Sequence, residues 1–270
     1  MKIAQSQYAL WLVLGTAACL FLFVMVRGMR HSLRRKKWKT AAADLAVIFI
    51  ILGSAYWYFF VYEAPVQTDI PFVYEELPAY SDAAVTEINN NIPYFTEEEK
   101  QAEEYELYGS LDKLGRCTSA MAMIGRDMMP QEERGEIETI RPTGFIGARY
   151  DDLIEDGFLY NRCHLIAFEL TGENANERNL ITGTRYLNVE GMLYYENITA
   201  SYIRRTENHV LYRVTPVFLG SELVARGVLM EAYSIEDSGA GICFCVWCWN
   251  VQPGIRIDYA TGKSSREKPA

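Results

Sequence analysis

The sequence has few of the residues that build common metal and redox centres. Only three of its 270 residues are histidines, and none of its six cysteines combines the spacing of a zinc site with enough further ligands nearby. Cys245 and Cys248 form a CxxC within the alternating run ICFCVWCWN. We interpret them as small apolar residues of a buried strand, with a disulfide or redox pair as the alternative. The composition therefore gives no sign of a structural zinc module.

Two stretches near the amino terminus lack charged residues altogether. Residues 8–26 and 45–62 are each long enough to cross the hydrocarbon core of a bilayer. The loop between them, at residues 27–40, carries seven cations, which favours the cytoplasmic side. We therefore predict a membrane hairpin of two transmembrane helices at residues 1–62, with the rest of the chain on the extracellular side. A cleaved signal peptide is the alternative for the first stretch.

Basic residues are scarce after the hairpin. Residues 63–270 hold 34 acidic and 18 basic residues, and the stretch 63–106 alone holds 12 acidic residues and one base. This excess is unusual for a protein that holds nucleic acid by neutralising phosphates, but it suits an enzyme that must release its product. We predict an acidic linker at 63–106 with a short helix that starts at Thr96 and contributes no core.

The remaining chain has the mixed pattern of an α+β domain, predicted at 107–262 and followed by a tail at 263–270. The runs FLYNRCHLI and NLITGT predict two short strands. The run TRYLNVEGMLYYENITASYIRR has apolar residues at helical spacing. Three further strands are predicted from HVLYRVTPVFL, VARGVLMEAYSI and GICFCVWCWNV. A central antiparallel sheet with an inserted strand–strand–helix unit is the expected assembly.

The residues with the most chemical potential lie in that inserted unit. His164 ends the first strand, and Arg162 lies two residues earlier, so both side chains are expected on one face. A neutral imidazole can accept a proton from water, and a guanidinium can offset charge on phosphate. Asn188 offers an amide oxygen to a divalent cation. On a straight helix Glu196 would lie ~12 Å further along and roughly 80° around, so both cannot bind one ion directly. Glu196 would then orient metal-bound water; the alternative is that Gly191 allows a late helix start. Asn179 is expected to hold the second strand.

Several ordered blocks resemble a known family. The stretch NRCHLIAFELTGENANERNLITGTRYLNVEGMLYYEN is similar to the DNA/RNA non-specific endonucleases, and within them to the streptococcal DNA-entry nuclease and streptodornase group. These belong to the ββα-metal, or His-Me finger, class. The likeness extends over residues 111–262 and includes LGR, NVEGM, NHVLYRVTP and NVQPGIRIDYATG. The family signature Asp-Arg-Gly-His stands here as Asn161-Arg162-Cys163-His164.

The resemblance implies a role for each of these residues. His164 corresponds to the general base that activates water, and Arg162 to the arginine that stabilises charge on the phosphate. Asn188 corresponds to the single amide ligand of Mg²⁺, for which Mn²⁺ is a substitute. Glu196 corresponds to the carboxylate that holds a metal-bound water, and Asn179 to a supporting asparagine. The change to Asn161 removes a negative charge near the site.

The sequence thus predicts a membrane-anchored, Mg²⁺-dependent endonuclease that hydrolyses DNA, and RNA as a further substrate, with little sequence preference. Its partners would be nucleic acid and, through the hairpin, membrane lipid, with no obligate protein partner. A second hypothesis is a catalytically weak surface module that captures DNA for uptake. A third is a toxin-like secreted effector whose amino-terminal segment serves export. His209 begins a strand and is expected to be structural, and Arg116, Arg126, Arg141 and Arg149 are candidate phosphate contacts.

Overall fold

The computed structural model describes residues 72–267, which fall within one compact unit of the chain. The predicted membrane hairpin at 1–62 and the first part of the predicted linker lie outside these residues. Within residues 72–267, no helix combines the length and apolar character needed to cross a bilayer.

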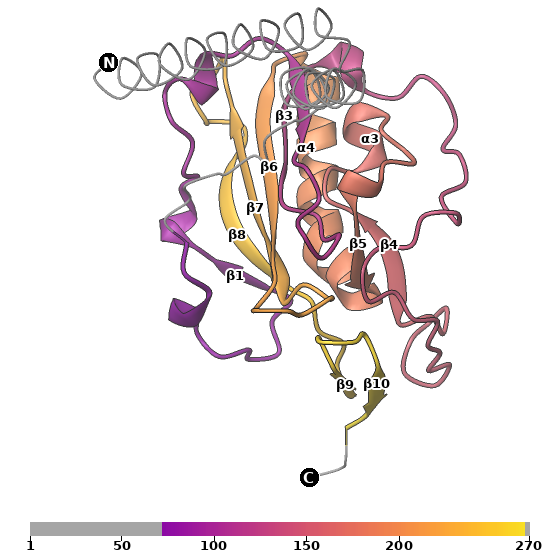
Figure 1. The fold of residues 1–270 in the computed structure, drawn as a ribbon. Helices are drawn as coiled ribbons and strands as arrows, with labels where there is room; N and C mark the ends of the chain where they lie inside the picture. Colours follow the sequence, from indigo (N-terminus) through magenta and orange to yellow (C-terminus); the bar gives the residue numbers. More distant parts are fainter. Residues whose placement is uncertain (1–71, 268–270) are drawn as a thin grey trace, which may run out of the picture. The chain divides into compact units, whose positions relative to one another are not determined.

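A six-stranded antiparallel sheet forms the centre of the fold (Figure 1). Its strands follow the order β1-β8-β7-β6-β3-β2. Their bounds are β1 Val85–Glu87, β2 Tyr105–Tyr108, β3 Ala120–Ile124, β6 Val210–Val217, β7 Gly227–Ser234 and β8 Cys243–Trp249. The predictions of a central antiparallel sheet and of its last three strands are confirmed.

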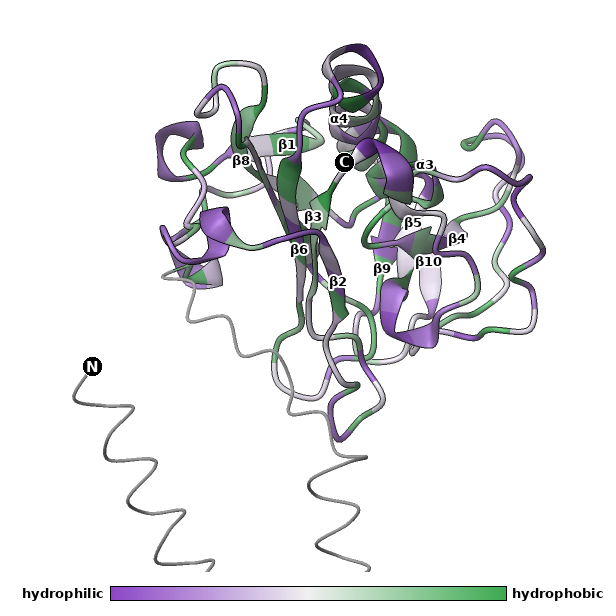
Figure 2. Ribbon diagram, turned by 90° about the horizontal axis from the view of Figure 1, so that it is seen from above, coloured by the Kyte–Doolittle hydropathy of each residue, from purple (hydrophilic) through white to green (hydrophobic). Residues whose placement is uncertain are grey.

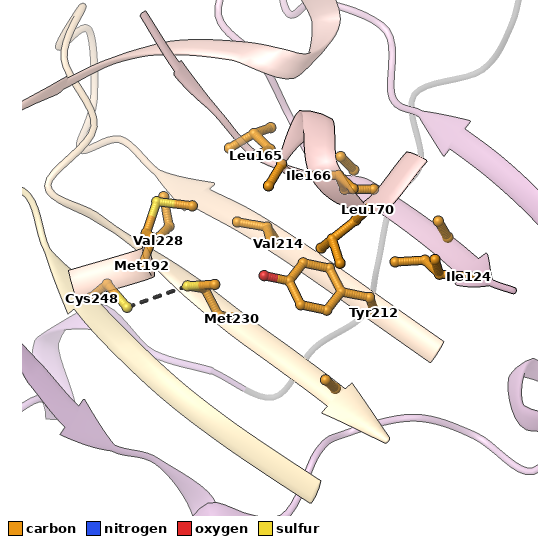
Figure 3. Close-up of a cluster of buried hydrophobic side chains, with 14 of the residues drawn as sticks. Ile124, Leu165, Ile166, Leu170, Met192, Tyr212, Val214, Val228, Met230 and Cys248 are labelled. Atoms are coloured by element: carbon orange, nitrogen blue, oxygen red, sulfur yellow. Dashed lines mark hydrogen bonds between the residues drawn. The ribbon is translucent and has the colours of Figure 1, made fainter. Parts of the chain in front are cut away.

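The inserted unit covers one face of this sheet. It consists of the strand pair β4 Tyr160–His164 and β5 Leu180–Thr184, the short helix α3 Phe168–Thr171 and one long helix. The long helix is π-helical over Leu187–Met192 and continues as the α-helix α4 over Leu193–Thr206. Buried side chains from the unit and from the sheet form the main core between the two layers, including Leu165, Leu170, Met192, Tyr212 and Met230 (Figure 3). Figure 2 shows the apolar strands inside and many hydrophilic residues on the outer turns. The predicted strand–strand–helix unit is therefore present.

The opposite face of the sheet is covered by the segment that precedes β3. Trp247 and Trp249 of β8 are buried there beneath aromatic rings, and Phe72 stacks on Trp247 with ring centroids 5.3 Å apart. Tyr74 and Tyr80 contact the same tryptophans edge-on. Strands β1 and β2 lie in this segment as well. The prediction that residues 63–106 form a linker without a core is therefore wrong for residues 72–106, because their aromatic residues bury the second face of the sheet.

A buried ion pair fixes this segment to the sheet. Arg213 of β6 pairs with Glu231 of β7 at 2.7 Å, and both side chains are almost fully buried. Arg213 also reaches Glu99 at 3.1 Å, and Glu231 accepts a hydrogen bond from the backbone of Tyr94. Thr96 and Glu99 exchange the two hydrogen bonds of a capping box, as predicted, but only the single 3₁₀ turn Glu99–Gln101 follows.

The remaining elements are short. Strands β9 Ile255–Ile257 and β10 Ser264–Arg266 form a hairpin, so the predicted tail at 263–270 contains a paired strand. Further 3₁₀ turns lie at Tyr74–Glu76, Asn89–Asn91, Arg126–Met128 and Glu177–Asn179. The five described cysteines are all free thiols, and Cys245 and Cys248 are buried in β8, which confirms their interpretation as apolar strand residues.

Candidate active site

The strand pair β4–β5 presents two of the predicted residues to one cavity. In β4, Arg162 pairs with Thr182 and His164 with Leu180 of β5. Because side chains alternate along a strand, Arg162 and His164 point to one side and Cys163 to the other. Arg162 and His164 both line an open cavity of about 920 Å³, whereas Cys163 is 1% exposed in the main core.

The same cavity collects most of the residues that the sequence singled out. Asn161, Asn188 and Glu196 line it together with Arg162 and His164. Asn179 does not line it. The side chain of Asn179 instead accepts a hydrogen bond from the backbone N–H of Ile166 and donates one to its carbonyl, both at 2.9 Å. Asn179 therefore pins the chain directly after His164 to the start of β5, as expected for a supporting residue.

His164 is held by contacts on both ring nitrogens. Nε2 lies 2.8 Å from the carbonyl oxygen of Asn174, which can only accept, so Nε2 carries the proton. The other nitrogen, Nδ1, then has a lone pair and accepts a hydrogen bond from Arg134 Nη2 at 3.3 Å. Burial and the Arg134 charge together lower the pKa of His164 to about 4, with burial the larger cause and the hydrogen bond to Asn174 opposing the shift. The imidazole is therefore neutral near pH 7 and can accept a proton at Nδ1 once Arg134 moves away.

Arg162 is also engaged in this structure. Its Nε donates to the carbonyl of Ile140 at 2.6 Å, and its Nη2 donates to the carbonyl of Glu138 at 2.9 Å. The guanidinium also lies over the ring of Phe145, 4.6 Å from its centroid. The loop at residues 134–140 thus contacts both His164 and Arg162. A phosphate in the cavity would meet the remaining Nη1 edge, or displace the loop carbonyls.

The π-helical turn at Leu187–Met192 alters the expected relation between Asn188 and Glu196. A π turn takes up one residue more than an α turn. The eight residues from Asn188 to Glu196 therefore rotate like seven α-helical residues, about 20° short of two full turns. The angle of roughly 80° expected for a straight helix therefore does not apply here. Both side chains consequently face the same cavity, although Glu196 stays about two turns further along the axis.

The carboxyl group of Glu196 is buried without a protein partner. The side chain is 8% exposed, and within residues 72–267 it makes no hydrogen bond or ion pair. Burial and, to a smaller extent, the nearby Glu169 raise its pKa to about 8, against the opposing charge of Arg134. A buried carboxyl that the protein leaves without a partner is suited to meet a cation or its water ligands.

The donor set fits a hard divalent cation. Asn188 and Glu196 offer oxygen atoms, which Mg²⁺ prefers, and Mg²⁺ retains several waters and needs few protein ligands. Among the described residues, no group of three or more His, Cys, Asp or Glu side chains is arranged to hold a metal ion. The donor set of this cavity thus differs from that of a closed structural zinc centre.

The sequence did not indicate two arginines that line this cavity, nor the residue that orients the His164 ring. Arg134 and Arg185 line it, and the carbonyl of Asn174 fixes the His164 tautomer. Arg134 lies in an irregular loop, where no periodic pattern marks its direction. The four arginines predicted as phosphate contacts, Arg116, Arg126, Arg141 and Arg149, do not line the cavity. Arg116, for example, pairs with Asp112 at 2.7 Å.

The two other histidines have different positions. His209 lies one residue before β6 and contacts two carboxylates, Glu236 through Nδ1 and Glu104 through Nε2. It does not line the cavity, and its contacts join the turn after β7 to the start of β2. His31 lies outside the described residues.

Comparisons with known proteins point to one family. Residues 96–236 match the sequence model of the DNA/RNA non-specific endonucleases. A deoxyribonuclease of Streptococcus dysgalactiae subsp. equisimilis is 35% identical over 116 residues, which make up 41% of this chain and 34% of the relative. The match thus spans about a third of that relative's length.

Solved structures give the same indication. NucA from Streptococcus agalactiae with a bound magnesium ion superposes with a TM-score of 0.60 at 26% identity, over 68% of this chain and 87% of NucA. The Sda1 nuclease with a bound zinc ion superposes with a TM-score of 0.51 at 30% identity, over 60% of this chain and 82% of Sda1.

Proposed function

The chain belongs to the DNA/RNA non-specific endonuclease family, and on that premise we propose that it is a membrane-anchored, Mg²⁺-dependent endonuclease that hydrolyses phosphodiester bonds of DNA, with RNA as a further substrate. The observation that carries the proposal is the shared cavity. It brings a neutral imidazole, a guanidinium, an amide oxygen and an unpartnered carboxyl to one place. Each group matches a separate need of phosphodiester hydrolysis.

His164 acts as the general base. After Arg134 leaves Nδ1, this nitrogen takes a proton from the attacking water, while the Asn174 carbonyl keeps the proton on Nε2. The water oxygen forms a bond to phosphorus as the bond to the leaving oxygen breaks. Arg162 offsets the negative charge that builds on the phosphate.

Asn188 and Glu196 hold the cation in this proposal. Asn188 would supply a direct oxygen ligand to a divalent cation, and the carboxyl of Glu196, about two turns along the helix, would accept hydrogen bonds from waters near it. A bound Mg²⁺ supplies charge stabilisation for the phosphate and the leaving oxygen. The magnesium found with NucA supports this choice of metal.

Membrane anchoring rests on the two uncharged stretches within residues 1–62 and on the seven cations between them. The enzyme domain would then lie at the outer surface of the cell membrane. Protease added to intact cells should remove the domain, whereas complete protection of the domain would place it inside and contradict the proposed topology.

A plasmid assay tests the catalytic proposal. The full-length protein in detergent should degrade plasmid with Mg²⁺, and EDTA or His164→Ala should abolish this. His209→Ala is the matched control, because His209 lies outside the cavity and should leave the rate unchanged. Nucleic-acid binding without any turnover would instead support the hypothesis of a surface module for DNA capture.

A further inference from the structure

One buried thiol touches the proposed metal ligand. Cys163 Sγ lies 3.1 Å from Asn188 Oδ1, 3.5 Å from Met192 Sδ and 3.8 Å from the carbonyl oxygen of His164. A thiol has a single proton to donate, and the amide oxygen is both the nearest of these acceptors and a stronger one than a thioether sulfur. The geometry therefore directs the S–H group at Asn188 Oδ1.

This contact determines how the amide of Asn188 is oriented. In the part of the chain that the structure describes, the thiol is the only hydrogen-bond partner of Asn188 Oδ1. An amide oxygen has two lone pairs, so it can accept the S–H group with one and face a cation with the other. With the amide reversed, its N–H₂ group would meet a thiol sulfur that accepts only weakly.

The position of the sulfur is tightly constrained. Cys163 is 1% exposed and lies in the interior of β4. On the neighbouring strand, a Cβ atom added to Gly183 would lie 2.6 Å from Cys163 Cβ and 3.2 Å from its Sγ. Gly183 therefore leaves the space that a side chain at position 163 needs. The sulfur in turn bridges β4 to the π-helical turn that carries Asn188.

We propose that Cys163 is a positioning residue that holds Asn188 Oδ1 in the orientation that binds the divalent cation. The inference rests on the proposed function, because it assigns Cys163 a role toward the ligand of that same site. The family signature Asp-Arg-Gly-His has a glycine at the position of Cys163. A glycine has no side chain and cannot make this contact. In other metal sites, mutating a residue that hydrogen-bonds to a metal ligand changes metal affinity by about 10- to 100-fold. Because a thiol is a weak donor, we expect an effect at the lower end of this range.

Metal binding to the full-length protein in detergent tests the proposal directly. Isothermal titration with Mn²⁺, without substrate, should show a roughly tenfold weaker affinity for Cys163→Ala. The Mg²⁺ concentration for half-maximal cleavage should rise to a similar extent, with little loss of rate at saturating Mg²⁺. Cys163→Ser should stay within about threefold of the wild type, because its hydroxyl can also donate.

Cys248→Ala is the matched control. Cys248 is a buried thiol of the same core, its Sγ lies 3.4 Å from Met230 Sδ, and it makes no hydrogen bond to Asn188 (Figure 3). This variant should lose stability but keep wild-type Mn²⁺ affinity. Equal Mn²⁺ affinities for the wild type and Cys163→Ala would overturn the positioning role while leaving the nuclease proposal intact. A loss of Mn²⁺ affinity in Cys248→Ala as large as that in Cys163→Ala would have the same meaning. A wild-type protein that neither binds Mn²⁺ nor cleaves would overturn both proposals.

Discussion

At the scale of single residues, burial adjusts the two ionisable groups of the cavity in opposite directions. It disfavours the charged form of each group, so it lowers the pKa of His164 to about 4 and raises that of Glu196 to about 8. At neutral pH and without a cation, the imidazole is a free base and the carboxyl is largely protonated. The His164 imidazole can therefore accept a proton from water, while the Glu196 carboxyl needs a nearby cation to ionise fully.

Arg134 affects His164 through both its hydrogen bond and its charge. Arg134→Ala removes a positive charge that disfavours the imidazolium, so the pKa of His164 should rise above about 4. An NMR titration of His164 in the metal-free protein would measure the shift. Arg266→Ala is a charge-matched control, because Arg266 pairs with Asp152 outside the cavity. Equal His164 titration in the wild type and Arg134→Ala would show that the contact is absent in solution.

Glu196 should make the metal-free protein less stable as pH rises. Its folded pKa of about 8 exceeds the unfolded value of 4.5, so the folded state binds more protons between these values. Relative to the wild type, Glu196→Gln should gain about 3 kcal/mol of unfolding free energy between pH 5 and pH 8. Urea unfolding in EDTA at both pH values measures this. A constant difference between the two proteins would mean that Glu196 ionises normally.

At the scale of elements, strands β4 to β8 and helix α4 follow from the sequence because their apolar residues repeat with the periods of strands and helices. Two features do not follow. β1 and β2 are short edge strands in an acidic segment; β1 pairs with β8 far along the chain, and β2 pairs with the nearby β3. The π turn at Leu187–Met192 adds a residue without interrupting the apolar pattern, so the shared direction of Asn188 and Glu196 could not be predicted.

The β4–β5 pair offers a test of packing next to the site. Gly183→Ala should cost about 1–3 kcal/mol of unfolding free energy, because the added Cβ meets the side chain of Cys163. Cys163→Gly removes that clash, so Gly183→Ala should cost less unfolding free energy in a protein that already carries Cys163→Gly. Chemical denaturation of the four proteins gives the coupling energy. Strictly additive effects would show that the two positions do not press on each other.

At the scale of the whole domain, the sheet is covered on both faces, and each cover has a different task. The inserted unit carries the cavity, and the segment before β3 closes the opposite face over Trp247 and Trp249. The sequence revealed the first layer through its site residues. The second layer could not be predicted from the sequence, because the acidic residues before β3 outnumber the few aromatic residues that bury the sheet.

The second cover should be required for stability. A fragment that begins at residue 107 loses β1, the first half of β2 and the rings packed on Trp247 and Trp249. Each buried aromatic side chain contributes about 1.5–3 kcal/mol, so the loss should exceed about 5 kcal/mol relative to a fragment that begins at residue 72. Urea unfolding followed by tryptophan fluorescence compares the two. Equal stability would mean that residues 72–106 are dispensable for the fold.

The convergence of His164 and Asn188 on one cation-bound phosphate is tested most directly by anomalous diffraction from crystals that contain Mn²⁺. We expect one ion in the cavity within about 2.0–2.6 Å of Asn188 Oδ1, on the side that faces His164 and close to the carboxyl of Glu196. An ion bound elsewhere, with Asn188 uncoordinated, would contradict the account.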